Sequence, residues 1–230
     1  MKAKTSGLAY RLPGPLRRHI LHFEALIDDA VIAFAAALPD RARVLDAGSG
    51  EGAYRRRFWR QSYTGIDLAV GDAAWDYSRI DVLADLQAQP FADASFDGAI
   101  HIVTLEHVRE PALALAEIAR VLKAGAPFLA VVPHEWEVHQ SPNDYYRYTR
   151  HGMEYLLEKA GFTGLRIDPA GGYFRLLARR LLGGLQFFPL WFQPVAALLA
   201  GPPALLLPFL DGLDREKNFT LGYICFARKR

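Results

Sequence analysis

Apolar and polar positions alternate with two different periods along the chain. From Pro13 to Leu38 apolar residues recur at spacings of three and four, which predicts a helix that ends before Pro39. Short apolar runs then alternate with segments of helical spacing, a pattern typical of a mostly parallel sheet covered by helices. The expected strands are 43–46, 63–67, part of 78–83, 96–103, 127–132, a run near 165–167 and 219–227, and the later expected helices are 111–122 and 149–160.

One stretch breaks this alternation. Residues 181–210 hold five prolines and no charged side chain. A membrane-spanning helix needs about 20 apolar residues in unbroken helix, and the prolines predict that no such stretch forms. We therefore expect the apolar insert, residues 175–215, to meet a membrane surface or an acyl-chain substrate. The alternative is burial against the rest of the chain or in a homodimer.

Several residues of the insert and its flanks suit a membrane surface. Trp191 and the phenylalanines suit the interface between water and lipid. Cations near both ends of the insert would attract anionic head groups. These cations are Arg175, Arg179, Arg180, Arg215 and Lys217.

Composition and charge narrow the class of protein. The 230 residues, 51% of them apolar, suffice for one α/β domain with a substantial core, and the net charge of +2 gives no reason to expect nucleic acid as partner. The single cysteine, Cys225, excludes an internal disulfide and a cysteine-rich metal site. Residues 1–12 are expected to be a loose polar segment. Met1 to His19 lacks the continuous apolar run of a secretory signal, so a cytoplasmic location is expected, with peripheral contact at the inner face of the membrane.

A glycine-rich loop follows the first expected strand. Residues 44–52 read Val-Leu-Asp-Ala-Gly-Ser-Gly-Glu-Gly, which places Asp46 just before Gly48, Gly50 and Gly52. Glycines let the backbone turn sharply and let a ligand approach it closely, and the helix expected to follow, through Phe58, would point its amides at that ligand. A dinucleotide-binding loop needs its third glycine one residue later, which disfavours a nicotinamide-dependent dehydrogenase.

A carboxylate ends the second expected strand. Asp67 closes the run Thr-Gly-Ile-Asp, at the same sheet edge as the glycine loop. A carboxylate at this place can accept hydrogen bonds from both hydroxyls of a ribose. The glycine loop upstream favours that role over a solvated loop aspartate.

The glycine loop and three later segments resemble class I S-adenosylmethionine (SAM)-dependent methyltransferases of the bacterial type 11-like group. The resemblance covers about 40–133 well, and 140–163 and 219–230 more loosely. It implies a Rossmann-like, seven-stranded, mostly parallel sheet with helices on both faces and an antiparallel last strand, supplied by 219–227. The segments that carry it are 44–52, 85–91, 95–108 and 117–125.

The resemblance implies SAM as cofactor and assigns contacts to it. Asp85, in a segment with Pro90 and Phe91, would accept from the adenine amino group, with Asp81 as the alternative, and Leu86 would offer its amide to the ring. The complete expected set is Asp46, Ala47, Gly48, Gly50, Asp67, Leu68, Asp85, Leu86 and Ile102.

The resemblance also implies a domain layout. A single methyltransferase domain would span 1–230. Its parts would be an N-terminal helical cap (1–40), a SAM-binding core (41–174 and 216–230) and the apolar insert (175–215).

Acceptor-binding residues are expected beyond the carboxyl ends of the fourth and fifth strands. Residues 133–149 form a loop dense in histidine, carboxylate and aromatic groups, and loops at this edge carry function more often than packing. Its Asp-Tyr-Tyr-Arg-Tyr-Thr segment resembles a bacterial subgroup often found with cell-surface polysaccharide or lipid enzymes. The expected catalytic residues are His134, His139, Tyr145 and His107.

Each of these residues also has a structural interpretation. His134 and His139 act either as general base or as loop histidines bonded to backbone. His107, in a Glu-His pair after strand four, lies either at the floor of the site or in a helix cap or the core. Arg147 binds an acidic acceptor group or pairs with Asp144.

Other functions are less well supported. His134-Glu135 is not followed by a histidine at 138, so the spacing of an H-E-x-x-H zinc site is missing and no metal is expected. No Asn-Pro-Pro-Tyr type segment follows strand four, which argues against methylation of adenine in DNA. The sequence therefore favours methyl transfer to a small-molecule or lipid- or glycan-linked acceptor. The alternative is a non-catalytic SAM-fold adaptor for a membrane or a partner.

Overall fold

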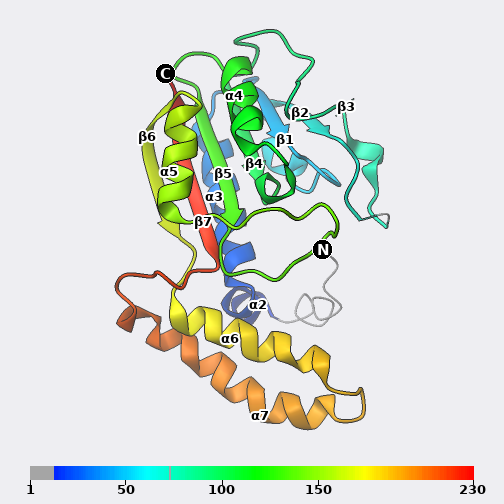
Figure 1. Cartoon of the computed structure of the whole chain (residues 1–230), viewed down its shortest axis with the longest axis vertical. Coiled ribbons are helices and arrows are strands. Elements are labelled where there is room, and N and C mark those ends of the chain that lie inside the picture. Colours follow the sequence, from blue (N-terminus) through cyan, green and yellow to red (C-terminus); the bar gives the residue numbers. More distant parts are fainter. Residues whose placement is uncertain (1–12, 73) are drawn as a thin grey trace. The chain divides into compact units, whose positions relative to one another are not determined.

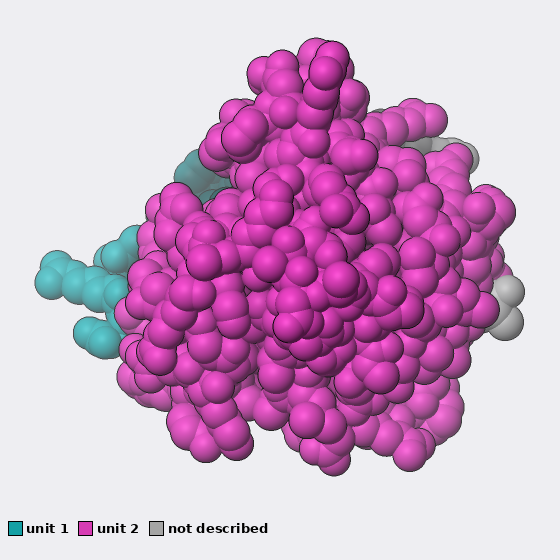
Figure 2. Space-filling view, turned by 90° about the horizontal axis from the view of Figure 1, so that it is seen from above, with its two compact units in different colours: residues 1–26, 169–222 teal, residues 27–168, 223–230 magenta. Residues whose placement is uncertain are grey.

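A computed structural model describes residues 13–72 and 74–230. The expectation of a loose segment at 1–12 lies outside the described residues. The chain divides into two compact units, coloured separately in Figure 2. Unit 1 holds Met1–Leu26 and Pro169–Gly222, and unit 2 holds Ile27–Asp168 and Tyr223–Arg230.

Unit 2 is built on a seven-stranded sheet with the order β3-β2-β1-β4-β5-β7-β6 (Figure 1). The pairs β2–β3, β1–β2, β1–β4 and β4–β5 are parallel, and β7 runs antiparallel. This confirms the expected fold class. The strands are β1 (Arg43–Ala47), β2 (Ser62–Asp67), β3 (Val82–Leu83), β4 (Gly98–Ile102), β5 (Pro127–Pro133), β6 (Phe162–Pro169) and β7 (Gly222–Lys229).

The central strands are apolar because helices cover them on both faces. All five residues of β4 are buried, and so are all but the first residue of β1 and of β5. His101 interrupts the apolar run of β4, yet it is fully buried, and its Nδ1 lies 2.5 Å from the Ala47 carbonyl oxygen. Burial lowers the pKa of His101 to about 4, so the ring is neutral and Nδ1–H donates to that carbonyl.

Three helices of the expected pattern are present. α3 (His22–Ala37) follows α2 (Gly14–Ile20), so the single helix predicted from Pro13 to Leu38 is broken at Leu21. α4 (Pro111–Val121) buries Leu115 and Ile118 against the sheet. α5 (Arg150–Lys159) begins at the predicted cap, where the Thr149 hydroxyl accepts the Gly152 amide.

The helix predicted after the glycine loop is wrong. Turns lead instead to a four-residue 3₁₀ helix, η1 (Arg55–Phe58). Gly52 has a φ of +69°, which a helix does not allow, and the Arg55 guanidinium reaches Asp81 at 2.5 Å. No α-helix therefore points its amides at a ligand here.

Unit 1 contains the apolar insert as a helical hairpin. It comprises α6 (Tyr173–Gly183), η4 (Gly184–Phe187), α7 (Gln193–Leu206) and η5 (Leu207–Leu213). Two carboxylates from η5 and the turn after it cap the start of α6. Asp211 accepts the Gly172 amide at 3.0 Å and the Arg175 amide at 3.1 Å, and Asp214 accepts the Tyr173 amide at 2.8 Å.

The expectation that prolines interrupt this segment is also wrong. α7 and η5 continue into one another as a 21-residue helical segment, Gln193–Leu213, with a mean hydropathy of 1.5. It is long and apolar enough to cross a membrane by length and composition. Pro202 and Pro203 lie inside α7, which continues past them to Leu206 and then leads into η5.

Candidate functional site

The glycine loop folds over the carboxyl end of β2. Gly48, Gly50 and Gly52 have positive φ angles of 89°, 50° and 69°. The amides of Gly48 and Ser49 both donate to the Ile66 carbonyl, at 2.8 and 3.0 Å. These bonds turn the loop toward the neighbouring strand, so the ends of β1 and β2 form one surface.

The loop also presses against the segment that follows β4. A Cβ atom at Gly48 would lie 2.3 Å from Cγ2 of Thr104, closer than real contacts allow. The Thr104 hydroxyl donates to the Gly48 carbonyl at 3.2 Å. Gly48 is therefore required by packing as well as by its backbone conformation.

Asp67 is joined directly to the glycine loop. Its Oδ2 accepts the Gly50 amide at 2.9 Å and its Oδ1 accepts the Ala69 amide at 2.8 Å. The side chain is half-buried. Each carboxylate oxygen has a second lone pair, so the group can still accept from a ligand while it positions the loop.

Asp46 precedes the glycine loop. We call the glycine loop, Asp67 and the segment around Asp85 together the cradle. The carboxylate of Asp46 is buried and accepts a short hydrogen bond from the Tyr63 hydroxyl. Burial raises the pKa of Asp46 to about 7, although the Tyr63 hydroxyl acts in the opposite direction. Tyr63 is a residue that sequence reasoning missed, because it lies within β2 and resembles any half-buried strand tyrosine.

The two candidates for the adenine amino group differ in their partners. Asp81 accepts the Gly65 amide at 2.7 Å and pairs with Arg55 through the same oxygen. Asp85 accepts from the amide and side chain of Gln87 at 2.9 and 3.1 Å. Among the described residues, Asp85 forms no ion pair, whereas Asp81 is paired with Arg55. Asp85 therefore stays the expected partner of the adenine amino group.

Of the remaining predicted cofactor residues, two end strands and two follow strands. Ala47 ends β1, and Ile102, buried, ends β4. Leu68, next to Asp67, is 46% exposed, and Leu86, next to Asp85, is buried. Their contacts with a cofactor stay predictions.

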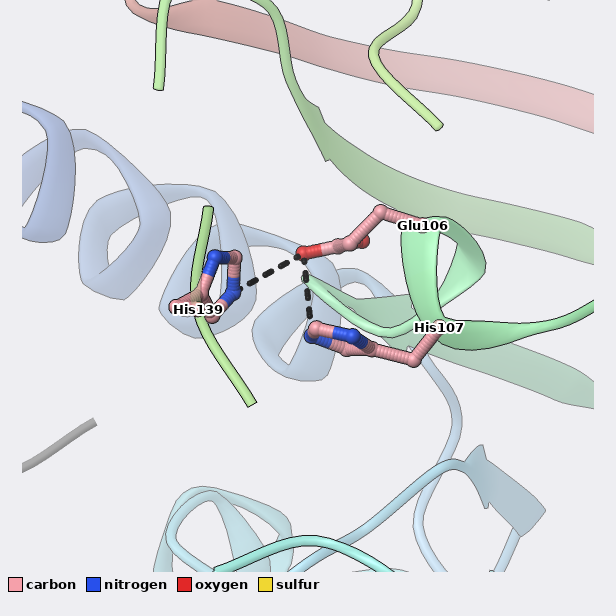
Figure 3. Close-up of side chains that lie close together, drawn as sticks. All are labelled: Glu106, His107 and His139. Carbon is pink, nitrogen blue, oxygen red and sulfur yellow. Dashed lines mark ion pairs between the residues drawn. The ribbon is translucent and has the colours of Figure 1, made fainter. Parts of the chain in front are cut away.

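Two of the predicted catalytic histidines meet at a carboxylate. Glu106 and His107 belong to η3 (Leu105–His107) after β4, and His139 comes from the loop after β5 (Figure 3). Oε1 of Glu106 lies 3.7 Å from Nε2 of His107 and 3.8 Å from Nε2 of His139. The two rings are perpendicular, with centroids 4.7 Å apart. We call these three residues the Glu106 cluster.

Glu106 is the most unusual group in this cluster. It is fully buried, and neither carboxylate oxygen has a hydrogen-bond partner among the described residues. Burial raises the pKa of Glu106 to about 8, with its own backbone amide and Arg147 acting in the opposite direction. Sequence reasoning assigned a role only to the neighbouring His107, although the acidic residue of the Glu-His pair was the signal that could have revealed it.

The acceptor loop is held by an internal ion pair. Arg147 donates to both oxygens of Asp144, at 2.6 and 2.8 Å, so the interpretation in which these two residues pair is confirmed. Burial pushes the pKa of Asp144 upward, but the hydrogen bonds from Arg147 and the His139 amide outweigh it and hold the pKa at about 2. The pair anchors the loop on which His139 lies.

His134 and Tyr145 have other surroundings. Nδ1 of His134 lies 3.0 Å from the Tyr148 carbonyl, and its ring packs on Tyr223, which matches the backbone-bonded interpretation. The Tyr145 hydroxyl bonds Arg109 at 3.0 Å and Asn143 at 3.1 Å. The Tyr145 amide donates to the Glu106 carbonyl at 2.8 Å, so Tyr145 borders the cluster through its backbone.

Comparison with known proteins shows which part of the chain resembles a methyltransferase domain. A family model described as a methyltransferase domain matches residues 45–130, the segment from β1 to β5 that carries the cradle. A curated relative, the malonyl-[acyl-carrier protein] O-methyltransferase of Erwinia pyrifoliae, is 36% identical over 96 residues, 38% of this chain. The matched segment spans 36% of the length of that relative, about a third.

Solved structures share the fold across most of the chain. The [4+2]-cyclase SpnF has a TM-score of 0.56 at 24% identity, covering 88% of this chain and 80% of its own. Phosphoethanolamine N-methyltransferase 2 of Haemonchus contortus, in complex with SAM, has a TM-score of 0.57 at 19% identity, covering 88% of this chain and 52% of its own. At this identity the likeness shows the fold alone.

The contact between Gly48 and Thr104 generates a prediction about stability. Gly48→Ala adds a Cβ that clashes with Thr104, whereas Gly125→Ala, at a φ of +75°, adds a Cβ with nothing within 4 Å. Gly125→Ala should lower the free energy of unfolding by about 1–2 kcal/mol through backbone strain. Gly48→Ala should lower it by about a further 1–3 kcal/mol through overpacking. Urea unfolding measures both, and equal losses would contradict the packing constraint.

The buried carboxyl of Asp46 predicts a pH-dependent stability. Its pKa is about 7 in the folded chain against 3.8 ordinarily, so the folded state keeps a proton that the unfolded chain has lost. The stability from this proton is complete at low pH and declines as the pH rises toward about 7, by at most about 1.4 kcal/mol per unit. The unfolding free energy of the wild type relative to Asp46→Asn should therefore fall between about pH 4 and 7 and then level off. A difference independent of pH would contradict the assignment.

Proposed function

We propose that this chain, which carries a class I SAM-dependent methyltransferase domain, moves a methyl group from SAM to an acceptor bound at the loop 134–149. The cofactor occupies the cradle formed by the glycine loop, Asp67 and the segment around Asp85. The acceptor is a small molecule or a group linked to a lipid or glycan.

The observation that carries this proposal is the bond from the Gly50 amide to Asp67. It brings the turn after β1 and the carboxylate after β2 together at the carboxyl edge of the sheet, where ligands of parallel α/β folds bind. In this position Asp67 can accept from the ribose hydroxyls of the cofactor.

Methyl transfer requires little covalent chemistry from the protein. The methyl group passes from the sulfonium to the acceptor in an in-line displacement, so the site mainly has to align the two and, where needed, remove a proton. The Glu106 cluster lies beside the acceptor loop, which contributes His139 to it.

The alternative is a non-catalytic SAM-fold adaptor. SpnF, with the same fold, is a [4+2]-cyclase, so the fold does not dictate methyl transfer. The intact cradle of Gly48, Gly50 and Asp67 supports cofactor use. A protein that serves only as an adaptor has no need of that cradle.

Unit 1 supports an acceptor at the membrane. Seven large apolar side chains of the hairpin are each 69% exposed or more, and exposed apolar surface of this extent marks an interaction site. We infer that the hairpin binds the inner face of the membrane peripherally and that the acceptor is lipid-linked. The seven residues are Phe187, Leu190, Trp191, Leu198, Leu199, Phe209 and Leu213.

The cations near the hairpin contribute unequally to this proposal. Arg179 lies 3.0 Å from Glu24, and Arg175 lies 3.7 Å from Asp211, so these two are engaged within unit 1. Arg180 and Arg215 are exposed. Near an anionic surface each contributes about 1 kcal/mol, so most of the affinity is expected from apolar burial.

The first test of the proposal is cofactor affinity. Asp67→Ala should weaken binding of SAM and of S-adenosylhomocysteine at least tenfold, because each charge-assisted hydrogen bond contributes about 1.5–3 kcal/mol. Calorimetric titration of the wild type should give one cofactor per chain. Asp72→Ala, a matched exposed carboxylate after the same strand, should bind normally. Equal affinity of Asp67→Ala and wild type would remove Asp67 from the ribose role, and no binding by the wild type would refute the proposed activity.

The second test is membrane binding by the hairpin. The wild type should float with phosphatidylglycerol-containing vesicles at low salt, and the double variant Leu198→Glu/Phe209→Glu should lose at least nine tenths of this binding, because each buried side chain contributes about 1.5–3 kcal/mol. Leu113→Glu on α4, with 54% exposure, is the control and should float normally. A wild type that does not float and forms a soluble dimer with a protease-resistant hairpin would establish a subunit interface instead.

A further inference from the structure

The tautomers of the two clustered histidines follow from their surroundings. Nδ1 of His107 lies 2.6 Å from the Asn143 carbonyl oxygen. A carbonyl oxygen only accepts, so Nδ1 carries the hydrogen and donates it. In the neutral ring, Nε2 then has a bare lone pair. This atom is buried, has no hydrogen-bond partner among the described residues, and faces Glu106.

His139 repeats this arrangement from the other side. Its Nδ1 lies 3.1 Å from the Glu137 carbonyl oxygen and 3.4 Å from Oδ2 of Asp144, and both are acceptors. Nδ1 of His139 therefore also carries the hydrogen, and Nε2 points a lone pair at Oε1 of Glu106. Figure 3 shows both rings directed at this carboxylate.

Three electron-pair donors thus converge, and the only hydrogen that could lie between them is the one on Glu106 that burial favours by raising its pKa. This proton does not resolve the arrangement, because separations of 3.7 and 3.8 Å are too long for a hydrogen bond. A buried carboxyl group without partners is strongly destabilising. A cation placed among the three atoms removes this destabilisation, because each donor then has a partner.

The dimensions suit a metal ion. Metal–ligand distances of about 2.0–2.2 Å separate two ligands of a tetrahedral ion by about 3.4 Å. The observed separations of 3.7 and 3.8 Å need to close by only a few tenths of an ångström, and all three donor atoms lie within 4.8 Å of one another.

The surroundings match those of metal-binding histidines. Such rings almost always donate their second N–H to a carbonyl or carboxylate, which fixes the tautomer, as Asn143, Glu137 and Asp144 do here. The charge of Asp144 is balanced by Arg147, which leaves the negative charge of Glu106 for the ion. The side chains of His107 and His139 are 13% and 10% exposed, so the two histidines are not completely enclosed.

We propose that Oε1 of Glu106 and the Nε2 atoms of His107 and His139 bind one divalent transition-metal ion of the Zn²⁺ type. Two imidazoles and one carboxylate form a ligand set that zinc and ferrous iron use in catalytic sites. With only three protein ligands, the ion keeps at least one open position for water or for an oxygen atom of the acceptor. The site rests on the Glu106 cluster alone and does not depend on methyl transfer.

Metal titration tests this proposal without cofactor or acceptor. Chelator-treated wild-type protein should bind one Zn²⁺ per chain in a calorimetric titration with ZnCl₂. Glu106→Gln and His139→Gln should each weaken this binding at least tenfold. His151→Gln is the matched control, because His151 is 89% exposed on α5 and lies beside Glu154 at 3.3 Å, a pair that could bind zinc adventitiously. This control should bind like the wild type.

The outcomes distinguish metal binding by the Glu106 cluster from cofactor binding by the cradle. S-adenosylhomocysteine affinity, measured on the same variants, should be unchanged within about threefold and reports that they are folded. Loss of zinc binding with retained S-adenosylhomocysteine binding supports the site. The proposal is overturned if the wild type binds no zinc, or if the cluster variants bind it as tightly as the wild type, or if only His151→Gln loses it. None of these results decides whether the chain transfers methyl groups.

Discussion

The contact between Gly48 and Thr104 constrains everything at the carboxyl edge of the sheet. The turn after β1 has to pass so close to the segment after β4 that a single methyl group would not fit. This closeness lets amides of the same loop donate to the Ile66 carbonyl and, through Gly50, to Asp67. Three strand ends are thereby locked together, and the η3 turn that bears Glu106 and His107 begins immediately after Thr104. The cradle and the Glu106 cluster are adjacent because one short segment serves both.

Much of the sheet could be predicted because its signals are local. The apolar runs of β1, β4 and β5, the glycines at 48 and 50, and the Thr149 cap each act within a few residues, and each lies where the pattern placed it. The prediction of a helix after the glycine loop was wrong because Gly52 adopts a positive φ, and the spacing of apolar residues carries no information about that angle. The prediction for the insert failed for the opposite reason. Prolines weaken a helix, but α7 contains Pro202 and Pro203 and continues past both.

The Glu106 cluster shows a different limit of sequence reasoning. The spacing around His134 was the only metal motif that the sequence offered for comparison. The histidine that meets His107 is His139, and the shared carboxylate, Glu106, comes from η3. Only the fold brings η3 and the loop after β5 together. The tautomer of each ring, which is the strongest argument about its chemistry, depends on the carbonyls of Asn143 and Glu137, and a sequence carries no information about such backbone contacts.

The two aspartates that cap α6 give the hairpin a modular character. Asp211 and Asp214 lie at its far end yet bond to the amides of Gly172 to Arg175 at its near end, so entry and exit of the segment meet within hydrogen-bond distance. Because the two ends of the hairpin meet, its length hardly affects the distance between the chain segments on either side of it. Such a clasp allows a lineage to lengthen, shorten or replace the apolar arm without re-registering β6 or β7. The arm can then diversify faster than the cofactor-binding core.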